Sequence, residues 1–132
     1  MSECCDGTKL IYACSGCSDV GEVADISARE LTKEGFGKMS CLAGVGAVLS
    51  GFVESAKGAD EVIVIDGCPV ACGKKILENA GAKAKSYILT EMGLVKGKTE
   101  VTEEVIEVVC RKIVGTAKDN GKECGEGCCS CS

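Results

Sequence analysis

Two closely spaced pairs of cysteines dominate the chemistry that this sequence offers. Cys14 and Cys17 form a C-x-x-C pair in CSGCSDVG, and Cys68 and Cys72 form a C-x-x-x-C pair in IDGCPVACGKK. The chain has twelve cysteines and no histidine, which excludes Cys–His zinc sites, Ser–His nucleophiles and the usual near-neutral general base. Two pairs of thiols that come together can ligate a metal ion or exchange disulfides.

Both pairs stand between a predicted strand and a predicted helix. Residues 9–13 (KLIYA) predict a short buried strand, and residues 61–66 (EVIVID) predict a central parallel strand covered on both faces. A weaker strand over residues 38–41 ends at a further cysteine, Cys41. Because parallel strands end at the same edge of a sheet, we expect these five thiols to converge there.

The remaining segments alternate between helical and strand patterns. Helices are predicted from the N-cap Asp19 to Gly35, over residues 44–57, after Cys72 as far as Gly81, and from the cap Thr102 to about Lys118. Residues 86–89 are a further strand candidate. The expected fold is a single three-layer α/β domain over residues 9–118, with a short parallel sheet flanked by helices. Residues 1–8 form a cysteine-containing extension, and residues 119–132 form a cysteine-rich tail.

Composition and charge narrow the classes of partner. The formal charge is −5, and no window combines Lys and Arg with aromatic residues, so nucleic acid is not an expected ligand. The most apolar segment, residues 42–53, is too short to span a bilayer, and no secretory signal is visible. We therefore expect a cytoplasmic protein whose thiols stay reduced and whose partner is a metal ion, with its protein partner unidentified.

Other residues in the two cysteine segments have properties that would support such a site. Gly16, Gly67 and Gly73 give a tight backbone whose amides can approach sulfur. Pro69 stiffens the loop and offers no N–H beside the neighbouring cysteine. Asp66, at the strand end, could orient a loop amide or a ligand, although turn formation alone would explain it.

Not every cysteine fits this pattern. Cys110 falls on the inward face of the last predicted helix, where a cysteine is usually a small apolar core residue. The valine and leucine positions of the patterned helices are likewise interpreted as core. A second soft-metal or thiol-exchange cluster is a separate hypothesis for the cysteines at the two ends of the chain, which are Cys4, Cys5, Cys124, Cys128, Cys129 and Cys131.

Three motifs in order make the chain similar to a known family. The segments CSGCSDVG, MSCLAG and, above all, Asp66-Gly67-Cys68 within IDGCPVACG resemble the DGC-domain proteins over about residues 9–115. These are small microbial proteins of unknown function to which zinc binding through shared cysteines is attributed. The resemblance implies zinc ligation by Cys14, Cys17, Cys68 and Cys72, with Cys41 as a fifth candidate, and it does not reach the cysteine-rich ends.

A looser likeness leaves the identity of the metal open. The C-x-G-C turn and the later G-C-P turn also resemble the domain of hydrogenase small subunits that holds a [4Fe–4S] cluster, which four thiolates serve equally well. Zinc in a structural or storage site is the leading hypothesis. The alternatives are an iron–sulfur protein, a thiol-disulfide redox enzyme in which Cys14 attacks and Cys17 resolves, and a metal or sulfur carrier that uses its tail.

Overall fold

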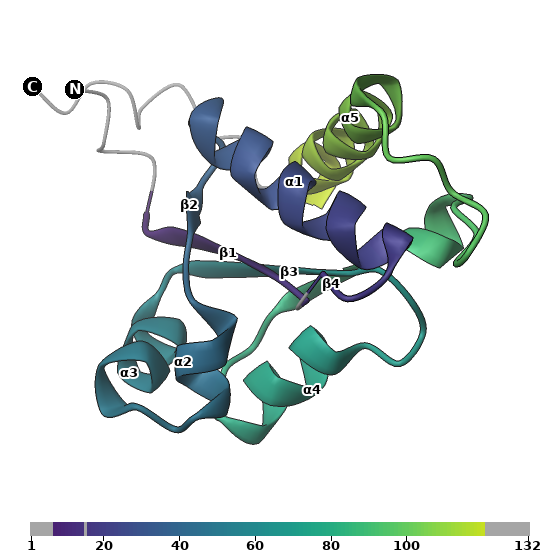
Figure 1. The fold of residues 1–132 in the computed structure, drawn as a ribbon. Coiled ribbons are helices and arrows are strands. Elements are labelled where there is room, and N and C mark those ends of the chain that lie inside the picture. The colour runs from purple at the N-terminus through teal and green to yellow at the C-terminus, as the bar shows by residue number, and fades with distance from the viewer. Residues whose placement is uncertain (1–6, 15, 121–132) are drawn as a thin grey trace, which may run out of the picture.

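The computed structural model describes residues 7–14 and 16–120, which fold into three layers (Figure 1). The middle layer is a fully parallel sheet with the strand order β2-β1-β3-β4. Its strands are β1 (Lys9–Ala13), β2 (Lys38–Met39), β3 (Glu61–Asp66) and β4 (Lys85–Ile88). The three-layer α/β class with a short parallel sheet is thereby confirmed.

Helices cover both faces of this sheet, as Figure 1 shows. One face carries α1 (Asp19–Lys33) and α5 (Glu103–Asn120), and the other carries α2 (Leu42–Gly46), α3 (Ser50–Gly58) and α4 (Cys72–Asn79). A short 3-10 helix, η1 (Leu89–Met92), follows β4. No helix within the described part of the chain is both long and apolar enough to cross a membrane.

Strand β3 explains why the sheet is buried on both sides. Its side chains alternate, so that Ile63 and Ile65 pack under α1 and α5 while Val62 and Val64 pack toward α2, α3 and α4. All four are at most 2% exposed. Because β3 lies between β1 and β4, its apolar run forms the centre of both cores, as its sequence predicts.

The start of α1 differs from the prediction. The N-cap is Ser18 and not Asp19, because the Ser18 hydroxyl accepts a hydrogen bond from the Gly21 amide at 3.1 Å. Asp19 is the first helical residue, and its carboxylate is turned toward a distant loop whose amides donate to it. That tertiary contact leaves the cap to the residue before it.

The segment over residues 44–57 is not one helix, and this prediction was wrong. Helix α2 ends in a Schellman motif, with Val48 at φ 59°, a hydrogen bond from the Val48 amide to the Val45 carbonyl and another from Leu49 to Gly44. After this turn the Phe52 ring packs on Gly44, where an added Cβ would lie 2.6 Å from the ring. Residues eight apart in a straight helix are about 12 Å apart along its axis, so this contact requires the break.

The same break exposes side chains that were expected in the core. Val48 is 77% exposed, Leu49 52% and Phe52 39%, whereas Val45 and Ala56 remain buried. The expectation that the valine and leucine positions of this segment are core is therefore wrong for Val48 and Leu49.

Candidate functional site

The two cysteine pairs follow adjacent strands. Strands β1 and β3 pair in parallel with Ala13 opposite Ile65, and the amide of Cys14 donates to the carbonyl of Ile65 at 3.1 Å. The chain runs outward from this pair in both directions, to β2 on one side and to β4 on the other. The carboxyl ends of β1 and β3 therefore form the topological switch point, where ligands of such sheets bind.

The β3–α4 loop, which carries Cys68 and Cys72, is held by a buried carboxylate. Asp66 is 1% exposed, and its two oxygens accept hydrogen bonds from the amides of Gly73 at 2.8 Å and Lys74 at 3.1 Å, at the start of α4. Between these anchors the Ala71 amide donates to the Cys68 carbonyl at 3.1 Å and closes a tight turn. Asp66 thus binds amides in the first turn of α4, and Pro69 occupies the second position of the turn before it, which favours proline.

The two cysteine loops touch at Gly67. A Cβ added there would lie 2.7 Å from the backbone of Val20 and of Gly21, in the first turn of α1. Only glycine allows this approach. The amide of Gly67 donates to the sulfur of Cys14 at 3.4 Å, so the backbone of one loop directly contacts the thiol of the other. Cys14 and Cys68 consequently lie at the same edge of the sheet.

Charges and burial around Cys14 act in opposite directions. Burial raises the pKa of the Cys14 thiol above its ordinary value, while hydrogen bonds from the amides of Gly67 and Gly16 lower it, and the negative charges of Asp66 and Cys68 raise it again. A positive charge at this edge, such as that of a metal ion, would favour the thiolate form of Cys14.

The other three thiols of the edge do not close around Cys14 and Cys68. Cys17, Cys41 and Cys72 are exposed, and all five are free of disulfides. The sulfur of Cys41 accepts a hydrogen bond from the Gly44 amide at 3.3 Å and thereby caps α2. Within the described residues, no three cysteine or acidic side chains are grouped closely enough to hold a metal ion.

Comparison with known proteins identifies the family. The model of the DGC domain matches residues 10–113. The chain belongs to the DGC-domain family. A relative from Pseudomonas aeruginosa, the "Anaerobic and virulence modulator AnvM", is 37% identical over 92 residues, which are 69% of this chain and 70% of that protein. No solved structure matches the chain.

Family membership and the cysteine-rich sequence are together consistent with metal binding. The matched region contains all five cysteines of the edge as well as Cys110. The six cysteines of the hypothetical second cluster lie outside the described residues. They are Cys4 and Cys5 near the N-terminus and Cys124, Cys128, Cys129 and Cys131 in the tail.

Cys110 lies in the core of the DGC domain. It is 5% exposed between α5 and α1, and its thiol contacts the carbonyl of Ser27 at 3.7 Å. Burial, together with the charge of Glu34, raises the pKa of Cys110 to about 11. This thiol is an apolar packing group, as its helical position predicts.

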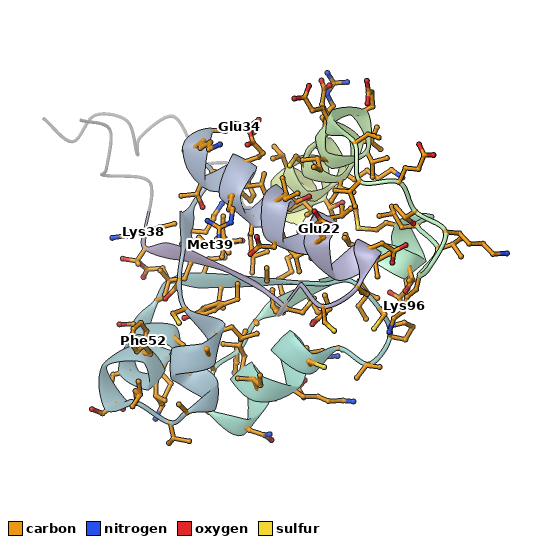
Figure 2. The ribbon with its side chains drawn as sticks, viewed as in Figure 1. Glu22, Glu34, Lys38, Met39, Phe52 and Lys96 are labelled. Atoms are coloured by element: carbon orange, nitrogen blue, oxygen red, sulfur yellow. The ribbon has the colours of Figure 1, made fainter. Side chains whose placement is uncertain are left out.

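Two residues of the site were missed in the sequence. Figure 2 shows Lys96, on the loop between η1 and α5, reaching the edge of the DGC domain at which α1 begins. Its ammonium lies 3.9 Å from the sulfur of Cys68. Asp19, taken from sequence for a helix cap, binds the same loop. The only sequence signal was a lysine in the glycine-bounded segment GLVKGKT, which no periodic pattern connects to the cysteines.

Proposed function

We propose that this protein holds one metal ion, zinc, between the β1–α1 and β3–α4 loops, with Cys14, Cys17, Cys68 and Cys72 as ligands. The observation that carries the proposal is the 3.4 Å contact between the Gly67 amide and the Cys14 sulfur, which joins the two loops. Four thiolates form the tetrahedral donor set of structural and storage zinc sites. With no ligand position left open, the bound ion would cross-link the loops and would not itself catalyse a reaction.

The donor set fits this role if two side chains turn inward. The amide of Gly67 contacts the sulfur of Cys14, and Gly67 keeps the backbone of the β3–α4 loop close to the first turn of α1. Cys17 and Cys72 are exposed and end in free thiols, so metal binding would draw them from solvent toward this pair. Each of the two pairs stands at the start of a helix, α1 or α4, whose N-terminal amides favour negative charge.

Cys41 remains the fifth candidate ligand. It follows β2 at the same edge of the sheet, beside β1. Because four thiolates already complete a tetrahedral zinc site and the exposed thiol of Cys41 caps α2, we place Cys41 outside the primary set of four. A Cys41→Ser variant should accordingly keep the metal.

Elemental analysis of anaerobically purified full-length protein tests the proposal. We expect wild type to contain zinc and the Cys14→Ser/Cys68→Ser double variant to contain about one equivalent less. A Cys110→Ala variant is the matched control, because it also removes a thiol and should retain the metal. Folded wild-type protein without metal, or a double variant that retains all of it, would contradict the proposal.

A [4Fe–4S] cluster is the second candidate, because the same four thiols could hold it. The name of the Pseudomonas relative includes the word anaerobic, and a cluster or a set of free thiols is best preserved without oxygen. Iron and acid-labile sulfide in a brown protein, in place of zinc, would establish this candidate. In either case we expect the protein in the cytoplasm, where thiols stay reduced.

Thiol–disulfide exchange is ranked below both metal proposals. An attacking cysteine of that class has a lowered pKa, whereas the pKa of Cys14 is raised, chiefly by burial. Disulfide-reductase activity that is lost in Cys17→Ser and fully retained in Cys68→Ser would reverse this ranking.

A further inference from the structure

A cationic side chain from a distant part of the sequence lies beside the proposed ligands. Lys96 belongs to the loop between η1 and α5, which the cysteine motifs do not include. Its ammonium lies 3.9 Å from the Cys68 sulfur, although 28 residues separate them in the chain. Figure 2 shows the Lys96 side chain at this edge of the molecule, below the start of α1.

The loop that carries Lys96 is fastened to the other cysteine loop. The carboxylate of Asp19 accepts hydrogen bonds from the Gly97 amide at 2.8 Å and from the Thr99 amide at 3.0 Å. Within the loop, the Thr99 hydroxyl accepts a hydrogen bond from the Val95 amide and donates one to the Val95 carbonyl, which closes the turn that contains Lys96.

Asp19 therefore links the two parts of the proposed site. It lies two residues after Cys17, at the first turn of α1, and it holds a loop whose lysine contacts the cysteine after β3. An interaction that served only the fold would not need a lysine at position 96, because the anchoring bonds come from backbone amides. The Lys96 side chain takes no part in anchoring the loop, and its ammonium can interact with the thiols.

We propose that Lys96 is a positioning residue that supplies the counter-charge of the metal–thiolate site, and that Asp19 sets it in place. The inference rests on the proposed function. Four thiolates around one divalent ion carry a net charge of about −2, and the buried Asp66 adds further negative charge beside Cys14. An ammonium within contact distance of one ligand stabilises that charge.

The expected effect is moderate and depends on salt. Lys96 is exposed, and exposed ion pairs correspond to at most about a fivefold change in an equilibrium constant. We expect Lys96→Met to weaken zinc binding by about fivefold at low ionic strength, and the difference from wild type to shrink toward zero in about 1 M salt. A purely structural role for the side chain would give no such salt dependence.

Zinc competition titrations with a chelator test the proposal on full-length protein. Lys96→Arg should retain wild-type affinity, and Lys98→Met, which removes an exposed charge from the same loop, is the matched control. If Lys96→Met matches the Lys98 control at low salt, the inference is overturned while the metal site stands. If wild type binds no metal, the proposed function fails, and that result is distinguishable from the first.

The zinc affinity of Asp19→Ala distinguishes two roles for Asp19, because the two roles predict changes in opposite directions. If Asp19 acted only as a negative charge near the site, its removal would tighten zinc binding. If it acts by holding Lys96, its removal weakens binding, and the double variant Asp19→Ala/Lys96→Met loses no more than Lys96→Met alone. Tighter binding in Asp19→Ala, or additive losses in the double variant, would contradict the assigned role of Asp19.

Discussion

The carboxyl edge of the sheet and the α1–α5 layer both contain cysteine, but the surroundings of the thiols differ between the two regions. At the edge, Cys14 and Cys68 lie among backbone amides, the Asp66 carboxylate and the Lys96 ammonium. In the layer, Cys110 lies among apolar side chains at 5% exposure. Neighbouring amide donors and a cation make a thiol a candidate ligand, whereas burial among apolar side chains makes it a core residue.

Alkylation rates provide the largest contrast between the two regions. Because the pKa of Cys110 is raised to about 11, its ionised fraction near pH 8 is about one in a thousand, and burial slows attack further. Iodoacetamide and peptide mass spectrometry should show the exposed Cys17 and Cys72 modified more than a thousandfold faster than Cys110 in metal-free protein. Comparable alkylation rates at all three cysteines would contradict the difference between the exposed edge and the buried layer.

Close backbone approach at the edge gives the next largest effect. Gly67→Ala places a Cβ 2.7 Å from the backbone of α1, so we expect it to destabilise the fold by about 3 kcal/mol. Urea unfolding measures this change. Gly51→Ala is the matched control: nothing lies within 4 Å of the added carbon in α3, so stability should rise slightly. Equal effects of the two changes would show that the loops do not press together.

Loss of the buried Asp66 carboxylate at the carboxyl edge is expected to have a smaller effect, and Asp60 at the amino edge provides the comparison. Asp66→Ala leaves the amides of Gly73 and Lys74 without their partner, at an expected loss of about 2 kcal/mol. Asp60→Ala removes an exposed carboxylate that accepts from the Thr8 amide at the amino edge, and should lose about 0.5 kcal/mol or less. Thermal unfolding measures the stability of both variants. A larger loss of stability in Asp60→Ala than in Asp66→Ala would contradict this ranking.

The parts of the fold predicted well from sequence are those that local patterns determine. The runs KLIYA and EVIVID give the bounds of β1 and β3 as found, because consecutive apolar β-favouring residues fit a strand covered on both faces. Their shared direction then places both cysteine pairs at one edge. The break at Val48 escaped prediction because a left-handed C-terminal turn usually carries glycine, and here a valine adopts it.

The position of the cysteines after the strands was predictable from sequence, but the charges beside them were not. Strand-to-helix turns marked Cys14, Cys17, Cys68 and Cys72, and the carboxylate of Asp66 stands next to one pair. Lys96 approaches only through tertiary contacts, since the bonds from Gly97 and Thr99 to Asp19 span about eighty residues and follow no sequence period. The proposed closure of the thiols around an ion requires exposed side chains to rotate, and spacing in the sequence does not determine that rotation.

One measurement tests the central claim most directly: a ¹H–¹¹³Cd correlation spectrum of cadmium-substituted full-length protein. Couplings run through the metal–sulfur bond, so the spectrum identifies the cysteines that share an ion. We predict one cadmium resonance correlated with the β-protons of Cys14, Cys17, Cys68 and Cys72. A spectrum in which no cadmium couples to cysteines from both loops would contradict the account.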